Sequence, residues 1–274
     1  MAFSRRHLLQ VAAAAAIAAS SFSSGIATAA DPASTKLILG ATAGYNYDVL
    51  KRAIQPQLEK AGYSVKLVEF NDYVQPNLAL ADGSLHANLF QHITYLNRFK
   101  EDQKLELVDL VQSTTAPMGI YAEKIRKLSD LPEGSVVTLP NDPTNLARAL
   151  QLLAQQQLIT LKSDIDPLRV SQRDVLDNPK KLRFTPIEAA QLPRTLGDAG
   201  IVVVPGNFAT AAGLDFNGAL ALERPPVAYQ QVVAIRRADT DKPWAQDLKK
   251  AFRSPFFKEV LQKEFPGYTV PAGL

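Results

Sequence analysis

The sequence of 274 residues contains no cysteine. This absence excludes disulfide bonds, thiol catalysis, cysteine-ligated zinc and iron–sulfur clusters, and it leaves no residue for a lipid anchor. Histidine is scarce as well, with only three residues, at positions 7, 86 and 92, and their spacing fits no metal-binding motif. We therefore expect no metal, no cofactor and no lipid anchor.

Charged residues make up 21% of the chain and hydrophobic residues 46%. A chain of this length and composition can bury a substantial core. The formal net charge is +3, but Arg5 and Arg6 lie in a segment that we expect to be removed, which leaves about +1. Basic residues are interspersed with acidic ones, without the aromatic and basic clusters of nucleic-acid-binding modules. We expect no nucleic-acid partner.

The first 30 residues are arranged like a secretory signal peptide. Arg5 and Arg6 precede an apolar run over 8–19, and small residues follow at 27–30. The apolar run is shorter than the about 20 residues that span a bilayer, so cleavage is favoured over a retained membrane anchor. The paired arginines resemble a twin-arginine export signal, with departures at Leu8 and Gln10. Both that route and general secretion stay open, and both predict a soluble protein in the periplasm or another extracytoplasmic space.

After residue 36, short apolar strands alternate with amphipathic helical patterns, which is typical of α/β proteins with largely parallel sheets. Turn-rich stretches at 114–117 and 205–207 interrupt the alternation, and we interpret them as two crossings between two α/β lobes. The cleft between two such lobes is a favoured place for a small ligand. Strands are predicted over 37–39, 65–70, 87–90, 105–111, 118–122, 136–139, 201–204 and 227–235, and helices over 47–61, 94–102, 144–156, 243–252 and 255–265, with another ending near 82.

Six stretches of the mature chain carry a family resemblance through their order and spacing, although any one of them alone is a weak signal. They are Phe70–Asn77, Ala87–His92 with Tyr95 beyond it, Pro117–Tyr121, Pro140–Asn145 with Arg148, Asp177–Lys180 and Glu188–Arg194. With these stretches the chain resembles the NlpA-type lipoprotein family, the methionine-binding proteins of bacterial ABC importers. The resemblance implies a two-lobed, type II-like periplasmic binding protein fold. The expected division is a signal peptide at 1–30, lobe 1 at 31–115 and 207–274, and lobe 2 at 116–206.

The resemblance also implies a set of ligand-binding residues: Tyr73, Phe90, His92, Tyr95, Arg148, Asn207 and Gln231. In that set the Arg148 guanidinium would offer two parallel donors to the carboxylate of an amino acid. The three aromatic rings would enclose a thioether side chain. His92 would donate to the carboxylate or fix a tyrosine, and the Asn207 amide oxygen would accept from the ammonium group. The family commonly has asparagine where this chain has Gln231, whose side chain is one methylene longer and so either reaches differently or shrinks the pocket.

Each of these residues also has a purely structural interpretation. Arg148 could belong to a surface ion pair, and the rings could simply fill core space. His92 could be a satisfied structural histidine, and Asn207 could stabilise the turn after Gly206.

Two classes of function follow. The first is a monomeric receptor that captures methionine, in the L or the D form, and delivers it to the permease and ATPase subunits of an ABC importer. Another apolar amino acid or a methionine-containing dipeptide is the alternative ligand. The second class is an exported α/β enzyme. The sequence has no GxSxG elbow, phosphate-binding glycine loop, dinucleotide fingerprint or other catalytic motif that would support it.

Overall fold

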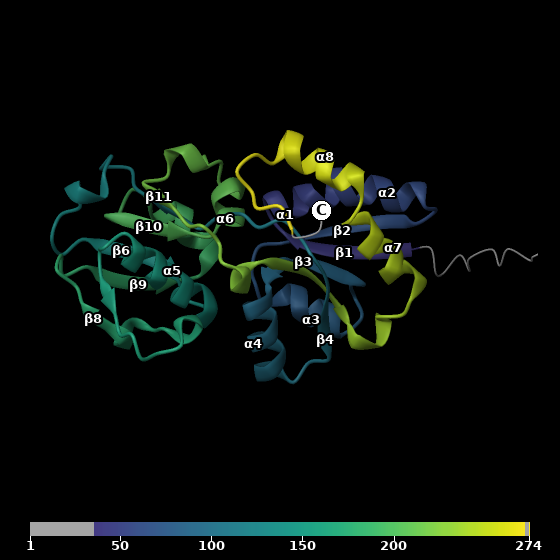
Figure 1. Ribbon diagram of the computed structural model, residues 1–274, viewed down its shortest axis with the longest axis horizontal. Coiled ribbons are helices and arrows are strands. Elements are labelled where there is room, and N and C mark those ends of the chain that lie inside the picture. Colours follow the sequence, from purple (N-terminus) through teal and green to yellow (C-terminus); the bar gives the residue numbers. More distant parts are fainter. Residues whose placement is uncertain (1–35, 272–273) are drawn as a thin grey trace, which may run out of the picture. The chain divides into compact units, whose positions relative to one another are not determined.

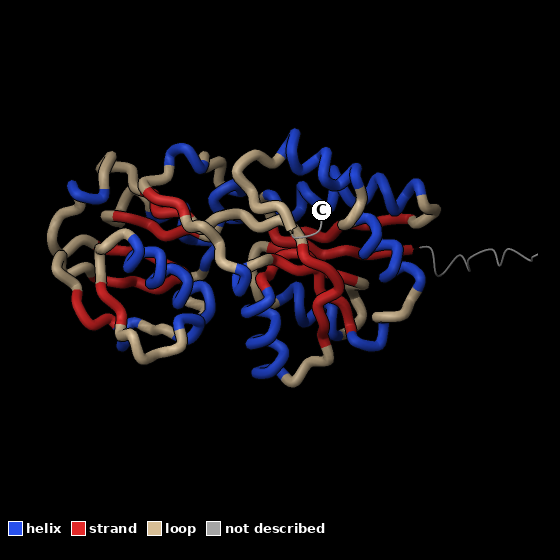
Figure 2. Tube along the Cα trace, viewed as in Figure 1, coloured by secondary structure: helices blue, strands red, loops and turns tan. Residues whose placement is uncertain are grey.

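The computed structural model describes residues 36–271 and 274, so the predicted signal peptide lies outside the described residues. The described chain forms two five-stranded sheets with helices packed on them (Figures 1 and 2). This arrangement confirms the predicted α/β class. We call the first sheet with its helices the first lobe, and the second sheet with its helices the second lobe.

The first sheet has the strand order β2-β1-β3-β12-β4. Strands β2, β1 and β3 run parallel, whereas β12 runs antiparallel to both of its neighbours. The sheet is therefore mixed, but β12 alone is reversed, because β4 runs in the same direction as β2, β1 and β3, and the expectation of a largely parallel sheet holds for those four strands. Its strands are β1 (Lys36–Thr42), β2 (Ser64–Phe70), β3 (Ala87–His92), β4 (Leu107–Gln112) and β12 (Gln231–Arg236).

Helices cover both faces of the first sheet, which explains why all six residues of β3 are buried. One apolar cluster joins this sheet to α1, α2, α7 and α8, and another joins its opposite face to α3 and α4. A π-helical turn at Leu50–Ile54 separates α1 from α2. The helices are α1 (Tyr45–Val49), α2 (Gln55–Lys60), α3 (Gln75–Ala81), α4 (Ile93–Gln103), α7 (Pro243–Ala251) and α8 (Pro255–Glu264).

The second sheet has the order β11-β5-β10-β6-β9 and packs its own apolar cluster against α5. It is also mixed, because β5 runs antiparallel to both β10 and β11. Its elements are β5 (Gly119–Tyr121), β6 (Val136–Pro140), β9 (Arg183–Ile187), β10 (Ile201–Val204), β11 (Ala221–Leu222), α5 (Pro143–Gln155) and α6 (Gly206–Ala211), and a separate hairpin-like pair is formed by β7 (Thr160–Leu161) and β8 (Val175–Asp177).

The chain passes from the first sheet to the second over residues 113–118, which include the predicted crossing at 114–117. It returns over residues 223–230, because β11 still pairs with β5 of the second sheet. The predicted return at 205–207 is corrected accordingly: Pro205, Gly206 and Asn207 resemble a connection in sequence, but they begin helix α6. The remaining boundaries of the lobe division stay predictions.

Within residues 36–271 and 274, no helix is both long enough and apolar enough to cross a membrane.

Candidate ligand-binding site

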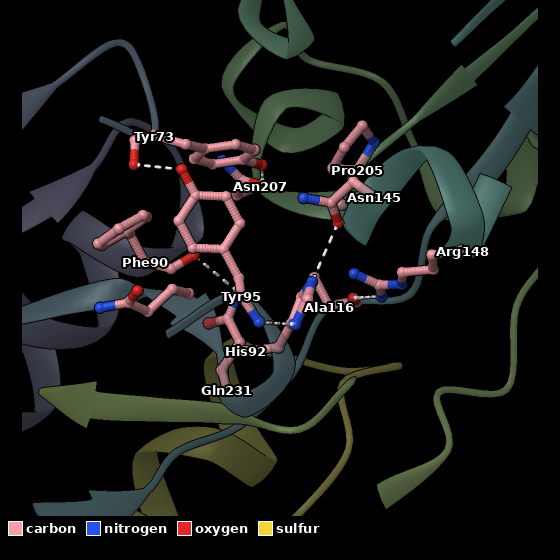
Figure 3. Close-up of a pocket in the computed structure, with 12 residues that line it drawn as sticks. Tyr73, Phe90, His92, Tyr95, Ala116, Asn145, Arg148, Pro205, Asn207 and Gln231 are labelled. Carbon is pink, nitrogen blue, oxygen red and sulfur yellow. Dashed lines mark hydrogen bonds between the residues drawn. The ribbon is translucent and has the colours of Figure 1, made fainter. Parts of the chain in front are cut away.

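All seven residues that the resemblance implied line one cavity, in which residues of both lobes meet (Figure 3). The cavity volume is about 10 Å³, which leaves room for about one water molecule. The sequence did not single out the other five residues of its lining. The complete lining is Tyr73, Phe90, Gln91, His92, Tyr95, Ala116, Asn145, Arg148, Pro205, Gly206, Asn207 and Gln231.

The three rings form one aromatic wall, and all of them are buried. The Tyr73 ring centroid lies 5.9 Å from that of Phe90 and 5.9 Å from that of Tyr95, and Phe90 and Tyr95 are 5.8 Å apart. On its other side Tyr73 contacts Phe208 of α6, with 5.1 Å between centroids. The wall thus lines the cavity and also fills core space, so the two interpretations of these rings are compatible.

His92 is the last residue of β3 and the N-cap of α4. Its Nδ1 accepts a hydrogen bond from the backbone N–H of Tyr95 at 3.0 Å, which places the ring proton on Nε2. Nε2 then donates to Oδ1 of Asn145, 3.2 Å away in the second lobe. Burial, together with the charge of Arg148, lowers the pKa of His92 to about 3. His92 is therefore a neutral donor at physiological pH.

Asn145 is held by the first turn of α5. Asp142 is the N-cap of this helix, and Pro143 follows it at a position where proline is favoured. The Asp142 carboxylate accepts from the backbone N–H of Asn145 at 2.9 Å and from its Nδ2 at 3.0 Å. These bonds turn Oδ1 of Asn145 towards His92. Sequence reasoning missed Asn145 as a site residue, although it ends one of the stretches that carry the resemblance.

Arg148, one turn further along α5, is buried rather than on the surface, with a side chain that is 5% exposed. Its Nε lies 2.8 Å from Oε1 of Glu223, and its Nη2 lies 2.6 Å from Oε2. The guanidinium also stacks over the Tyr229 ring, with its carbon 5.2 Å from the ring centroid. Burial works against the charged form, but Glu223 outweighs it and holds the pKa of Arg148 above its ordinary value.

One edge of the Arg148 guanidinium is thus occupied by Glu223. Nη1 makes no hydrogen bond to any other described residue, and Nη2 has a second, long contact of 3.4 Å to the carbonyl of Ala116. The opposite edge of the fork therefore remains available at the cavity. Sequence reasoning missed Glu223, because it lies far along the chain from Arg148 and before two prolines in no recognisable motif.

Asn207, in the first turn of α6, also bonds to the first lobe. Its Oδ1 accepts from the Tyr73 hydroxyl at 2.7 Å, and its Nδ2 donates to Oγ1 of Thr42 at 3.3 Å. Beside it, Gly44 has a positive φ of 84°, and a Cβ on this residue would overlap with the backbone carbonyl of Asn207. The close approach of the lobes therefore depends on a residue without a side chain.

Gln231, the first residue of β12, is bound to the scaffold by both ends of its amide. Its Oε1 accepts from the Tyr45 hydroxyl, and its Nε2 lies 3.4 Å from the carbonyl of Phe90. Its backbone N–H donates to Oγ1 of Thr115 at 2.9 Å. The Gln231 side chain thus reaches from the cavity lining to Tyr45, which does not itself line the cavity.

The arrangement suits recognition by hydrogen bonding and ring contacts. The lining combines a paired arginine, neutral histidine, amides and tyrosines, and it includes no serine or cysteine nucleophile. Among the described residues, no three histidine, aspartate or glutamate side chains gather closely enough to hold a metal ion.

The comparisons with known proteins point in one direction. The family model described as NlpA lipoprotein matches residues 37–273. "Probable D-methionine-binding lipoprotein MetQ" of Vibrio cholerae is 34% identical over 98% of this chain and 99% of its own length. "D-methionine-binding lipoprotein MetQ" of Salmonella typhi is 37% identical over 85% of this chain and 86% of its own. A nutrient binding protein from Burkholderia cenocepacia, solved bound to methionine, has a TM-score of 0.81 and 39% identity, covering 85% of this chain and 98% of its own.

These names contradict one expectation from the sequence. The matching family and the MetQ relatives are named lipoproteins. This name implies that they are anchored by a lipid outside the cytoplasm. The expectation of a freely soluble protein without a lipid anchor conflicts with this finding and is withdrawn. A location outside the cytoplasm fits the relatives.

Proposed function

The chain belongs to the NlpA lipoprotein family, and from that membership we propose that it is an extracytoplasmic receptor that binds methionine and delivers it to an ABC importer. The single observation that carries the proposal is the cavity at which the three rings, His92, Arg148, Asn207 and Gln231 meet. The relatives that are named for D-methionine and the similar structure bound to methionine support this ligand.

In this proposal the ligand carboxylate bonds to the free edge of Arg148. The ammonium group donates to Oδ1 of Asn207, which retains a second lone pair beside the one that accepts from Tyr73. The thioether lies along the wall of Tyr73, Phe90 and Tyr95, where sulfur–ring contacts are favourable.

A ligand enters only if the lobes separate, because the cavity of about 10 Å³ is far smaller than an amino acid. Separation breaks the hydrogen bonds that join the lobes at the cavity, which run from Asn207 to Tyr73 and Thr42 and from Asn145 to His92. The connections at 113–118 and 223–230 are then the hinge. Binding of the ligand to both lobes shifts the population back towards the closed form.

The family is one of binding proteins, and we propose that this member has no enzymatic activity. Its further partners are the permease and ATPase subunits of the importer. We also propose that the chain is a monomer without a nucleic-acid partner, and that the seven site residues act as described above.

Calorimetry with the purified protein tests this function. The panel contains L-methionine, D-methionine, leucine, norleucine and a methionine-containing dipeptide, and native mass spectrometry identifies any molecule that is retained during purification. We expect methionine to bind more tightly than leucine or the dipeptide. Binding of leucine without binding of either methionine isomer would refute the ligand, and turnover of any panel member would refute the receptor class.

A further inference from the structure

The feature that the proposed function leaves unused is Glu223, whose side chain is only 4% exposed. Both of its carboxylate oxygens contact Arg148, with Nε at 2.8 Å and 2.9 Å and Nη2 at 2.6 Å. A buried pair of this geometry compensates the arginine charge within the protein. Before any ligand arrives, the cation that lines the cavity is therefore already neutralised.

The position of Glu223 is fixed by the first connection between the lobes. Its backbone N–H donates to the carbonyl of Met118 at 2.8 Å, and the N–H of Met118 donates to Oε2 of Glu223 at 3.1 Å. Arg148 reaches the same connection through the carbonyl of Ala116. Glu223 thus holds one edge of the guanidinium and leaves the other edge directed at the cavity.

This pairing has a consequence for the charge of the ligand. A carboxylate that enters next to an unpaired, buried arginine would neutralise it, so a simple anion would bind well. Beside the Arg148–Glu223 pair, the same carboxylate brings an uncompensated negative charge into a buried site, which is costly. Asp142, bonded to Asn145 at the same cavity, adds a second carboxylate nearby. A zwitterion avoids this cost because it carries its own ammonium group.

We propose that Glu223 is a positioning and specificity-determining residue that, through Arg148, selects zwitterionic amino acids over anions of the same shape. The proposal rests on the function proposed above, since it concerns the same cavity and the same carboxylate. Glu223 itself does not line the cavity, and it acts only through the arginine.

The test compares two ligands on three proteins by calorimetry. The ligands are L-methionine and its deaminated analogue, in which hydrogen replaces the amino group. The proteins are wild type, Glu223→Gln, which removes the charge at nearly constant shape, and Glu223→Asp, which keeps the charge. We expect wild type to bind methionine at least about tenfold more tightly than the deaminated analogue. In Glu223→Gln the ratio of the two dissociation constants should shift by about tenfold or more in favour of the anionic analogue. Glu223→Asp should keep the wild-type ratio within about threefold.

If Glu223 has only a structural role, Glu223→Gln should bind both ligands more weakly by the same factor, and the ratio of their dissociation constants should not change. That result would overturn the inference and leave the proposed receptor function intact. Circular dichroism establishes that each variant is folded. If Glu223→Gln does not fold, the two affinities of wild type still test the inference. Binding of the deaminated analogue as tightly as methionine, or more tightly, would overturn it. If wild type binds methionine in neither isomeric form, the failure lies with the proposed function.

Discussion

The two sides of the cavity are built in different ways. The first lobe supplies all three rings of the wall, which contact one another at 5.8–5.9 Å between centroids. The second lobe supplies Asn145, Arg148 and Asn207, and two of these bond to side chains of the first lobe. When the lobes separate, the wall keeps its internal contacts, whereas the two asparagines lose theirs. Arg148 keeps Glu223, which lies at the start of the return connection, and Asn145 keeps its bonds to Asp142 of the same lobe.

The aromatic wall is therefore preorganised, whereas the polar side is completed on closure. A preorganised wall loses little conformational entropy when the ligand binds. The polar side can instead report the presence of a ligand, because its bonds to the first lobe break when the lobes separate and form again when the lobes close. Substitutions on the two sides should therefore have different effects.

The largest effect is expected on the polar side, from Arg148→Ala. This change removes the donors to the ligand carboxylate and leaves the buried Glu223 without its charged partner, so we expect a loss of affinity for methionine of at least about a hundredfold. The free energy of unfolding should fall by about 3–5 kcal/mol. Calorimetry and urea denaturation measure the two quantities. Nearly unchanged affinity in this variant would refute the assignment of Arg148.

On the wall, Phe90→Leu should have a smaller and more selective effect. Leucine retains most of the apolar volume but removes the ring, and a sulfur–ring contact contributes about 0.3–1.5 kcal/mol. We expect methionine to bind about two- to tenfold more weakly, while norleucine, which lacks the sulfur, is less affected. The ratio of the two dissociation constants is the measurement. An equal loss for both ligands would show that the ring serves only to fill space.

His92 of the first lobe bonds to Asn145 of the second, and its contribution to the free energy of unfolding should depend on pH. Its pKa in the folded protein is about 3, below the ordinary value of 6.5, because burial and Arg148 disfavour its charged form. Between these two values the unfolded chain binds more protons than the folded protein. The stability that His92 contributes is therefore complete above pH 6.5 and is lost as the pH falls towards about 3, at up to about 1.4 kcal/mol per pH unit.

Urea denaturation of wild type and His92→Gln over this pH range tests the histidine prediction. The glutamine side chain does not titrate, so the free energy of unfolding of His92→Gln should vary less with pH than that of wild type. Other acidic groups contribute to both curves and cancel in the difference. A difference curve without any slope would mean that His92 is protonated equally in the folded and unfolded states.

The smallest effect is expected from Gln231→Asn, which restores the family's residue. The shorter amide no longer reaches Tyr45, but the Tyr45 hydroxyl keeps the carbonyl of Thr114 and the N–H of Ala116 as partners. We expect the dissociation constant for methionine to change by no more than about threefold, as for most substitutions that leave polar groups satisfied. Complete loss of binding, measured by calorimetry, would show that Gln231 has a role different from that of the asparagine.

Local pattern was sufficient to predict the strand that ends in His92 and the helix that carries Arg148, but not helix α6, which carries Asn207. The strand at 87–90 and the helix at 144–156 were predicted, and they correspond to Ala87–His92 and Pro143–Gln155. A short, mostly apolar stretch and an Asp-Pro helix start are both local signals. Strands β9 and β11 were not predicted. Strand β9 has no continuous apolar run and β11 has only two residues, so pairing with neighbouring strands determines both.

The candidate site was predicted through resemblance rather than through pattern. Periodicity could not indicate that Glu223 pairs with Arg148 or that Asn145 meets His92, because these contacts join residues that are distant in sequence. The same limitation explains the misplaced return connection. Pro205 and Gly206 are typical turn residues, but whether a turn leads into another lobe depends on the pairing of β11 fifteen residues later.

Gly44 has no side chain, and its replacement would change how closely the two lobes approach. Its positive φ and its contact with the Asn207 carbonyl mean that any larger residue there would act as a spacer between the two surfaces. Replacement of Gly44 by alanine would strain the backbone at this φ and press on the Asn207 carbonyl, so it should favour the separated form while leaving every side chain of the cavity lining in place. Such a variant would let transport assays separate the importer's response to a ligand from its response to the shape of the receptor.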